Sequence, residues 1–192
     1  MSAVSIIGTG NMANAIGGVF AKGGADVTYI DRANTGSAPL AGDVVVLAVP
    51  YPALADIVAA YGDQFAGKIV VDITNPLNFE TFDSLVVPAD SSAAAGLQQQ
   101  LPTAKVLKAF NTTFAATLAA GKVGDLTTTV LIAGDDTAAK NTLAGLVTAG
   151  GLQAIDAGAL SRARELEAMG FLQLTLAAGE KITWTGGFGV VR

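Results

Sequence analysis

The feature that most constrains the fold is a glycine turn near the start of the chain, between an apolar segment and a helical pattern. Residues 3–7 are apolar except for one serine, and Gly8-Thr9-Gly10-Asn11-Met12-Ala13 follows them directly. From Asn11 to Lys22 the apolar residues recur at the spacing of one helix face. A strand that leads through a glycine turn into a helix begins a βαβ unit. We therefore predict that a parallel α/β sheet starts here.

The same turn has the composition of a dinucleotide-binding motif, with alanine in its third small position. Gly8 permits the tight turn, and Gly10 allows a pyrophosphate to approach the backbone. Free N–H groups at the start of the helix point toward such phosphates. A purely structural turn is the alternative, but its place between a strand and a helix favours binding. The predicted cofactor contacts here are Gly8, Thr9, Gly10, Asn11 and Met12.

Strand-like and helical segments alternate along the rest of the chain. Further strands are predicted at residues 25–30, 43–49, 68–73, 105–109, 128–133 and 152–155. Helices are predicted at about 53–65, 91–100, 137–149 and 162–178. This alternation indicates an α/β fold with a Rossmann-type, doubly wound, mainly parallel sheet. We predict one dinucleotide-binding domain over residues 1–192, with a small helical and tail extension from about residue 157.

The segment after the second strand is too short for the usual unit. Only residues 32–42, 11 in number, separate the strand ending near Asp31 from the one starting at Asp43. A helical crossover takes about a dozen residues or more, and Gly36 and Pro39 make this segment turn-like. We predict that one helix and one edge strand are missing, which leaves the adenosine side of the site open.

Asp31 and Arg32 end the second strand, where a dinucleotide-binding fold contacts the adenine ribose. An acidic residue there accepts hydrogen bonds from the ribose hydroxyls and favours NAD. The adjacent arginine can pair with a 2′-phosphate and favours NADP. A solvated ion pair is the structural alternative. The residues alone leave the choice between the two cofactors open.

Three later loops follow predicted strands at their carboxyl ends, where open α/β sheets bind ligands. They contain Val49-Pro50, Asn75-Pro76 and Asn111. The amides are candidates for hydrogen bonds to a ribose or a carboxamide, although Asn-Pro is equally a turn signal. In the last helix, Arg162, Arg164, Glu165 and Glu167 are expected on a solvated face. Trp184 and Phe188 are expected in a tail that packs on the core, with an interface as the alternative.

Composition excludes several kinds of chemistry. The chain has no histidine and no cysteine, which rules out a Ser-His-Asp triad, a thiolate nucleophile and a zinc-thiolate site. We identify no obligatory acid or base, so no catalytic residue and no metal ligand is predicted. The net charge of −5 argues against nucleic-acid binding. The sequence shows no membrane-spanning run and no signal peptide, so a cytoplasmic location is expected.

The spread of motifs resembles the NADP oxidoreductases dependent on the deazaflavin coenzyme, a family that includes the reductase domain of STEAP-type ferric reductases. The matching segments are residues 7–12, 43–50, 67–72, 74–77, 108–112, 133–136, 156–158, 163–164 and 166–167. The resemblance implies a nicotinamide site made from Thr9 to Met12, Val49-Pro50, Asn75-Pro76 and the Asn111 loop. It also implies a homodimer.

By the same resemblance, hydride passes between NADP(H) and a flavin-type or deazaflavin-type small molecule, a reaction that needs little proton transfer. Two departures stand out. The family usually has Ser-Arg where this chain has Asp31-Arg32, and the short segment 32–42 removes part of the adenosine wall. NADP is the expected cofactor, with NAD possible. The alternatives are a non-catalytic NAD(P)-sensing protein and an imine-type or pyrroline-carboxylate-type reductase.

Overall fold

The computed structural model describes residues 2–191 and shows one seven-stranded sheet. The strands are β1 (Ala3–Ile7), β2 (Asp26–Ile30), β3 (Val44–Leu47), β4 (Ile69–Asp72), β5 (Lys105–Lys108), β8 (Thr129–Gly134) and β9 (Gln153–Gly158). Their spatial order is β2-β1-β3-β4-β5-β8-β9. All neighbours pair in parallel except β5 and β8, which are antiparallel. A separate hairpin joins β6 (Lys122–Val123) to β7 (Leu126–Thr127).

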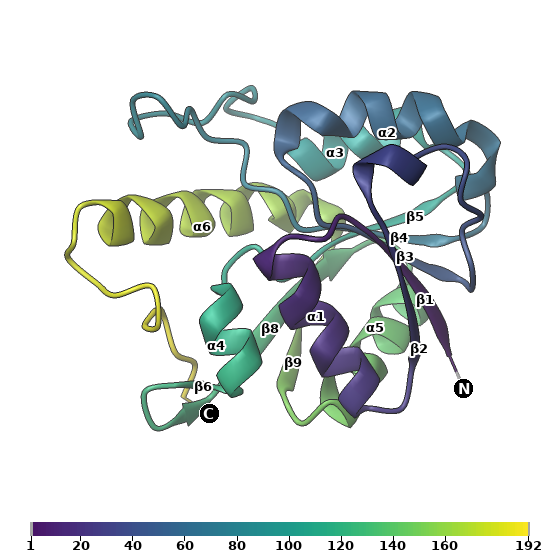
Figure 1. Ribbon diagram of the computed structural model, residues 1–192. Helices are drawn as coiled ribbons and strands as arrows, with labels where there is room; N and C mark the ends of the chain where they lie inside the picture. Colours follow the sequence, from purple (N-terminus) through teal and green to yellow (C-terminus); the bar gives the residue numbers. More distant parts are fainter. Residues whose placement is uncertain (1, 192) are drawn as a thin grey trace.

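Helices cover both faces of the sheet (Figure 1). One face carries α1 (Asn11–Lys22), α4 (Ala115–Ala120) and α5 (Thr137–Ala149), and the other carries α2 (Leu54–Tyr61) and α3 (Ala93–Gln100). Each layer buries one set of the alternating side chains of the near-continuous apolar strands, as expected of a parallel sheet. The longest helix, α6 (Ala163–Ala178), packs on α3 at one end and extends beyond the sheet at the other. The predicted doubly wound fold is confirmed.

The predicted deletion is confirmed as well, because β2 forms the edge of the sheet. Between β2 and β3 the regular structure is one turn of 3₁₀ helix at Arg32–Asn34. The chain then returns along the sheet, where the Ser5 hydroxyl donates to the Ala41 carbonyl at 3.0 Å and Leu40 is buried. A short segment rich in turns therefore replaces the helix and the strand.

Two local features differ from the sequence prediction. The α4 helix and the β6–β7 hairpin were not predicted, and they make β8 enter the sheet antiparallel to β5. Four of the six α4 residues are alanine, so the segment lacks a clear apolar period. The prediction of a core tail was wrong, because Trp184 is 52% exposed and Phe188 is 37% exposed. No helix among the described residues is long and apolar enough to cross a membrane.

Candidate functional site

The Gly8 turn brings β1 against the neighbouring strand segment. Gly8 has a φ of +122°, and a Cβ there would collide with the Ala48 carbonyl oxygen. Its N–H donates to the Ile30 carbonyl at 2.8 Å, while the Ala48 N–H donates to Ile7 at 2.9 Å. Both the positive φ and the lack of space require glycine at this position.

The start of α1 is open toward solvent and ligand. The first-turn N–H groups of a helix have no intrahelical acceptor, and Gly10 at the N-cap has no side chain to bond them. A Cβ on Gly10 would meet nothing within 4 Å, and Gly10 lines a cavity. Asn14, which the sequence analysis missed, fixes the turn by donating to the carbonyls of Thr9 and Gly10 at 3.0 and 3.1 Å. This arrangement suits an anionic group such as a pyrophosphate.

A cavity of about 760 Å³ continues from this turn across the ends of β1, β2 and β3 to α2. It contains six of the predicted site residues: Gly8, Thr9, Gly10, Arg32, Val49 and Pro50. Its wall does not include six others: Asn11, Met12, Asp31, Asn75, Pro76 and Asn111. It adds residues that the sequence analysis missed: Thr35, Pro52, Ala53, Asp56, Ile57 and Ala60. All of these except Thr35 lie on the helical segment that follows Pro50, and that predicted helix was their signal in the sequence.

Asp31 and Arg32 have different structural roles. One Asp31 carboxylate oxygen accepts the Asn34 backbone N–H and the Asn34 side-chain N–H, both at 2.9 Å. It therefore caps the 3₁₀ turn. Arg32 lines the cavity, and its guanidinium has no hydrogen bond or ion pair within residues 2–191. Of the two, the arginine is the side chain free to meet a ligand phosphate.

The amides Asn75 and Asn111 bind one another beyond the cavity. The Asn75 amide donates to the Asn111 carbonyl at 3.0 Å, and the Asn111 amide donates to the Asn75 side-chain oxygen at 3.0 Å. Asn111 also donates to the Leu166 carbonyl of α6 at 2.8 Å. Gly170 makes this approach possible, since a Cβ there would collide with the Asn75 side chain. The pair thus fastens α6 to the carboxyl ends of β4 and β5.

Phe110, which immediately precedes Asn111, has an unusual backbone conformation. Its φ is +64°, although its side chain is fully buried in an edge-to-face contact with Phe20, with ring centroids 5.9 Å apart. A left-handed conformation costs an L-residue about 1–2 kcal/mol. The packed ring offsets that cost and fixes the direction in which Asn111 leaves the strand.

A buried ion cluster lies below the same loops. The Lys108 ammonium contacts Asp72 at 2.9 Å, Glu167 at 2.8 Å and the Thr74 carbonyl at 2.6 Å. All three charged side chains are 0–1% exposed. Glu167 also accepts the Ala93 N–H at 2.9 Å at the start of α3. One lysine therefore connects β4 and β5 to α6, and through Glu167 to α3, while its ammonium faces two carboxylates.

The sequence prediction of a solvated Glu167 was wrong. Ala163, Leu166, Gly170, Gln173 and Ala177 are all buried, and their helical spacing places Glu167 on the same stripe. That spacing was the signal that sequence analysis missed. Burial raises the pKa of the Glu167 carboxyl above its ordinary value of 4.5, although Lys108 and the Ala93 N–H act in the opposite direction. A single lysine cannot fully neutralise both Glu167 and Asp72.

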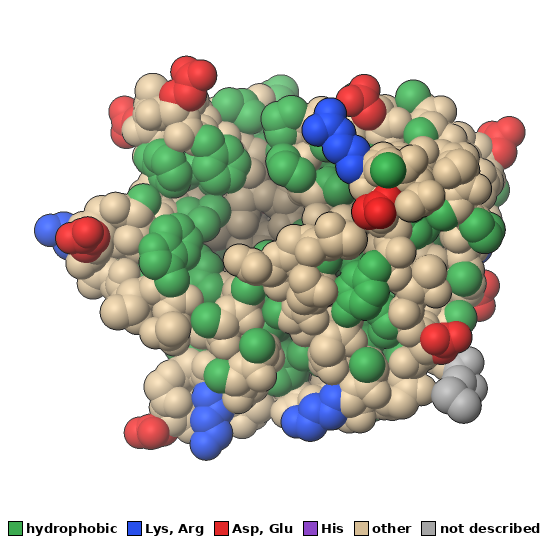
Figure 2. All heavy atoms as spheres, in the orientation of Figure 1, with side chains coloured by type: hydrophobic (Ala, Val, Ile, Leu, Met, Phe, Trp, Pro, Cys, Tyr) green, Lys and Arg blue, Asp and Glu red, His purple; other side chains and the backbone are tan. Residues whose placement is uncertain are grey.

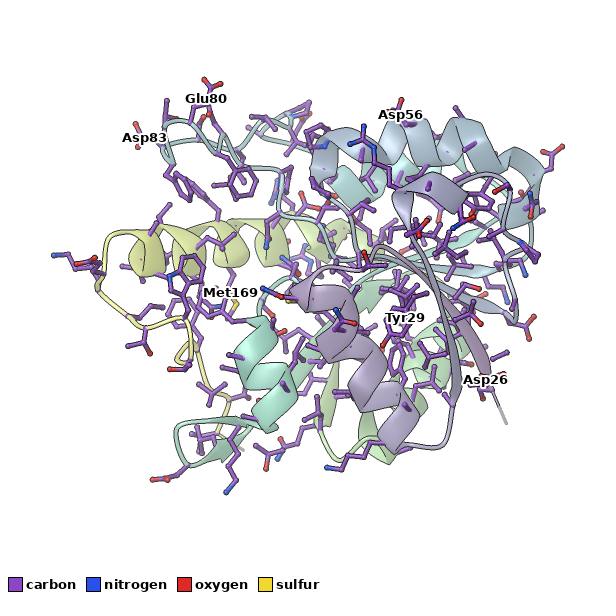
Figure 3. The ribbon with its side chains drawn as sticks, in the orientation of Figure 1. Asp26, Tyr29, Asp56, Glu80, Asp83 and Met169 are labelled. Carbon is purple, nitrogen blue, oxygen red and sulfur yellow. The ribbon has the colours of Figure 1, made fainter. Side chains whose placement is uncertain are left out.

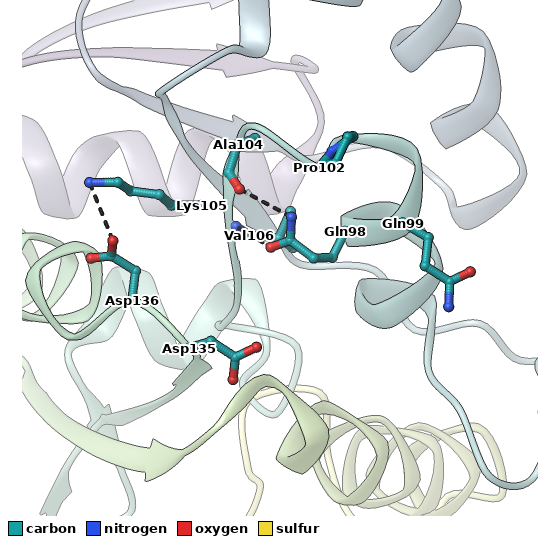
Figure 4. Close-up of a pocket in the computed structure, with 8 residues that line it drawn as sticks. All are labelled: Gln98, Gln99, Pro102, Ala104, Lys105, Val106, Asp135 and Asp136. Carbon is teal, nitrogen blue, oxygen red and sulfur yellow. Dashed lines mark hydrogen bonds and ion pairs between the residues drawn. The ribbon is translucent and has the colours of Figure 1, made fainter.

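A second cavity of about 580 Å³ lies away from these loops, where β5 begins (Figure 4). Its charged groups already have partners: Lys105 contacts Asp136 at 3.3 Å, and Asp135 accepts the Leu160 N–H at 2.9 Å. The Gln98 amide donates to the carbonyls of Leu101 and Ala104. Ligands of open α/β sheets bind at the carboxyl ends of the strands. The cavity at Gly8 is therefore the stronger candidate.

Comparisons with known proteins agree with this geometry. A family model described as "NADP oxidoreductase coenzyme F420-dependent" matches residues 34–76. The F420-dependent NADP reductase of Methanocaldococcus jannaschii is 33% identical over 149 residues, which make up 76% of this chain and 66% of that protein. The solved structure of a candidate F420-dependent NADP reductase from Arthrobacter sp. FB24 has a TM-score of 0.83 and 27% identity, covering 98% of this chain and 99% of that one. The chain belongs to this NADP oxidoreductase family.

The resemblance seen in the sequence is thereby confirmed. Metalloreductase STEAP3 of Rattus norvegicus is 40% identical over 107 residues, which make up 56% of this chain. The chain spans about a fifth of that protein's length (21%) and 66% of the archaeal reductase. Within the F420-dependent NADP oxidoreductase family, the model match at residues 34–76 includes the α2 wall of the cavity and ends at Asn75-Pro76.

Proposed function

We propose that this family member binds NADP(H) in the cavity at Gly8 and exchanges hydride between the nicotinamide and a flavin-type or deazaflavin-type small molecule. The observation that carries the proposal is the position of Arg32. This arginine has no partner among the described residues and lines the same cavity as the glycine turn. A guanidinium directly after the second strand, in the same cavity, can pair with the 2′-phosphate that distinguishes NADP from NAD.

The residues present fit this cofactor. The free space at Gly10 and the open N–H groups of α1 accept the pyrophosphate. Val49, Pro50 and Ile57 give the cavity an apolar side. NADPH supplies the hydride, so the protein's task is to position and shield the reactants. This agrees with a chain that lacks histidine and cysteine.

Space for an acceptor favours an enzyme over a sensor. Figure 2 shows a hollow next to the start of α1, between hydrophobic side chains of the loop after β4 and of the C-terminal tail. A wall of side chains would be expected there in a protein that binds NADP(H) without turnover. The homodimer and the cytoplasmic location remain predictions.

The cofactor assignment is tested by titrating the protein with NADPH and NADH while following nicotinamide fluorescence. We expect Arg32→Ala to weaken NADPH binding by about tenfold to 100-fold, the value of one or two charge-assisted hydrogen bonds. NADH binding should change by less than about twofold. Arg164→Ala is the matched control, because Arg164 is exposed on α6, outside the cavity, and pairs with Glu165.

Equal losses for both dinucleotides would contradict the 2′-phosphate role of Arg32. Tighter binding of NADH than of NADPH by the unmodified protein would mean that Asp31, and not Arg32, determines the cofactor preference. The bound NADPH complex is then mixed with flavins. Tight NADPH binding without oxidation by any flavin would contradict the proposed hydride transfer. It would favour a protein that senses NADP(H) without turnover.

A further inference from the structure

The cavity at Gly8 contains a carboxylate that the phosphates of NADP(H) cannot use. Asp56 lies in the first turn of α2, lines the cavity wall and is exposed. Its side chain has no hydrogen bond or ion pair within residues 2–191. Figure 3 shows it projecting from the solvent side of α2, so the carboxylate lies at the rim of the cavity and is open to a ligand there.

Local roles do not account for the place of Asp56 in the cavity wall. An acidic residue in the first turn stabilises a helix whichever way the helix faces. Arg32 lines the same cavity, but the two side chains form no ion pair. A carboxylate beside a site for a pyrophosphate and a 2′-phosphate repels both of them. Asp56 therefore favours binding only if it faces a part of the cofactor that donates hydrogen bonds.

The same face of α2 gives the cavity an apolar wall next to Asp56. Ala53, Ile57 and Ala60 line the cavity together with Asp56, at the spacing of one helix face. The two alanines have short side chains, and Ile57 is buried. A planar ring can therefore lie close to the helix at this point. Such a wall suits the apolar face of a purine, with Asp56 beside its polar edge.

The short segment after β2 forms the opposite side of the cavity. Arg32 and Thr35 line it there. A Cβ on Gly36 would lie 3.2 Å from the Ala60 side chain, so this segment packs against the last turn of α2. A base attached to a ribose at Arg32 would therefore lie between the segment and α2. Its outer edge would face the rim, because the usual helix and edge strand are missing on this side.

We propose that Asp56 selects the base of the dinucleotide by accepting a hydrogen bond from the exocyclic amino group of adenine. The inference rests on the proposed function and adds a specificity-determining residue on α2. On the adenosine side of NADP(H), only this amino group and the ribose 3′-hydroxyl donate hydrogen bonds. Arg32 holds the 2′-phosphate, and with it the ribose, at the end of β2, so the amino group is the donor that reaches α2. A base with a carbonyl oxygen in its place would set two acceptors against each other.

The test compares NADPH with its hypoxanthine analogue, reduced nicotinamide hypoxanthine dinucleotide phosphate. The analogue keeps both phosphate sites and the nicotinamide, but a carbonyl oxygen replaces the exocyclic amino group. Titrations that follow nicotinamide fluorescence give the dissociation constant of each. We expect the unmodified protein to bind NADPH about threefold to tenfold more tightly than the analogue, as for one hydrogen bond that stays accessible to water.

Variants assign the selectivity to this side chain. In Asp56→Asn the side-chain oxygen still accepts a bond from adenine, while the amide can donate to the hypoxanthine oxygen. The affinity ratio of the two dinucleotides should therefore fall to about one. Asp56→Ala should lower the ratio as well, because adenine loses its acceptor. The matched control is Asp63→Asn, since Asp63 is exposed in the turn after α2 and outside the cavity wall. That control should leave the ratio unchanged.

The outcomes separate this inference from the proposed function. Equal affinities in the unmodified protein would overturn base selection, and this result needs no variant to fold. A ratio unchanged in Asp56→Asn would overturn it too, because helix support or a bond to the 3′-hydroxyl affects both dinucleotides alike. If NADPH binds with the expected selectivity but no flavin oxidises it, the hydride transfer fails and base selection stands. If neither dinucleotide binds, both fail.

Discussion

The two halves of the site are assembled in different ways. The half proposed to bind phosphate consists of residues 8–12 and, after the next strand, Arg32. The start of α1 has no side-chain cap, and the Arg32 guanidinium has no partner among residues 2–191. The half at the ends of β4 and β5 depends on long-range bonds. Lys108 and Asp72 are 36 positions apart, and Ala93 and Glu167 are 74 apart. We conclude that the first half leaves groups free for a ligand, whereas the second half is held in one conformation by bonds between distant segments.

The largest effect should come from breaking the buried cluster. Lys108→Met leaves two carboxylates without their cation in a dry site, and we expect a loss of about 3–5 kcal/mol in the free energy of unfolding. The matched control is Lys105→Met in the same strand. Lys105 is partly exposed and pairs with Asp136, so its loss should be below about 1 kcal/mol. Urea unfolding measures both, and similar values for the two variants would contradict the comparison.

The contact between α6 and the asparagine pair gives the next effect. The added methyl group in Gly170→Ala collides with the Asn75 side chain and lies 2.8 Å from the Asn111 carbonyl. We expect about 1–3 kcal/mol of destabilisation, as for other overpacked sites. Gly145→Ala on α5 is the control, because a Cβ there meets nothing within 4 Å and helix propensity favours alanine. Thermal unfolding that ranks Gly145→Ala below Gly170→Ala would show that the close approach is unimportant.

The free energy of unfolding should also depend on pH, through the buried Glu167 of the second half. The pKa of Glu167 is raised in the folded protein, so the folded state holds this proton more tightly than the unfolded chain. Stability from this group is therefore complete below about pH 4.5 and falls as pH rises toward the folded-state pKa. Each unit of pKa difference corresponds to about 1.4 kcal/mol.

Glu167→Gln removes this titration. The stability of the unmodified protein minus that of Glu167→Gln should thus decline with rising pH across the window above pH 4.5. The lowered pKa values of Asp136, from its bond to the Ala139 N–H, and of Asp156, from its bond to Lys140, act in the opposite direction. Both are present in each protein and cancel in the difference. A difference that is flat or rises with pH would argue against a burial-dominated Glu167.

The smallest effect is expected beside the cavity at Gly8 and Arg32. Asp31→Ala removes the cap of the 3₁₀ turn, which should cost about 0.5–1 kcal/mol of stability. Because the turn carries Arg32, NADPH affinity should fall by a few-fold although the carboxylate itself is not in the cavity wall. Paired unfolding and fluorescence titrations check this. Tighter binding of NADPH on removal of Asp31 would instead indicate that its charge repels the 2′-phosphate.

The half proposed to bind phosphate can be predicted from the sequence because its information is local. A strand, a glycine turn and a helix follow one another within residues 3–22, and the shortness of segment 32–42 can be counted directly. The apolar strands likewise predicted the sheet. Helical spacing alone would have revealed that Glu167 is buried, because its neighbours Ala163, Leu166 and Gly170 form the buried stripe.

The partners of these residues depended on the tertiary structure. Lys108 within a buried strand identifies no acceptor until β4 and α6 bring Asp72 and Glu167 to it, and α3 brings the Ala93 N–H to Glu167. The sequence by itself determined the α/β fold, the missing edge unit and the glycine turn, since backbone periodicity and turn geometry are local properties. The tertiary structure alone decided that Asp31 caps a turn while Arg32 lines the cavity, and that Asn75 binds Asn111. Hydrogen-bond choice depends on which groups remain free when distant segments pack and water leaves.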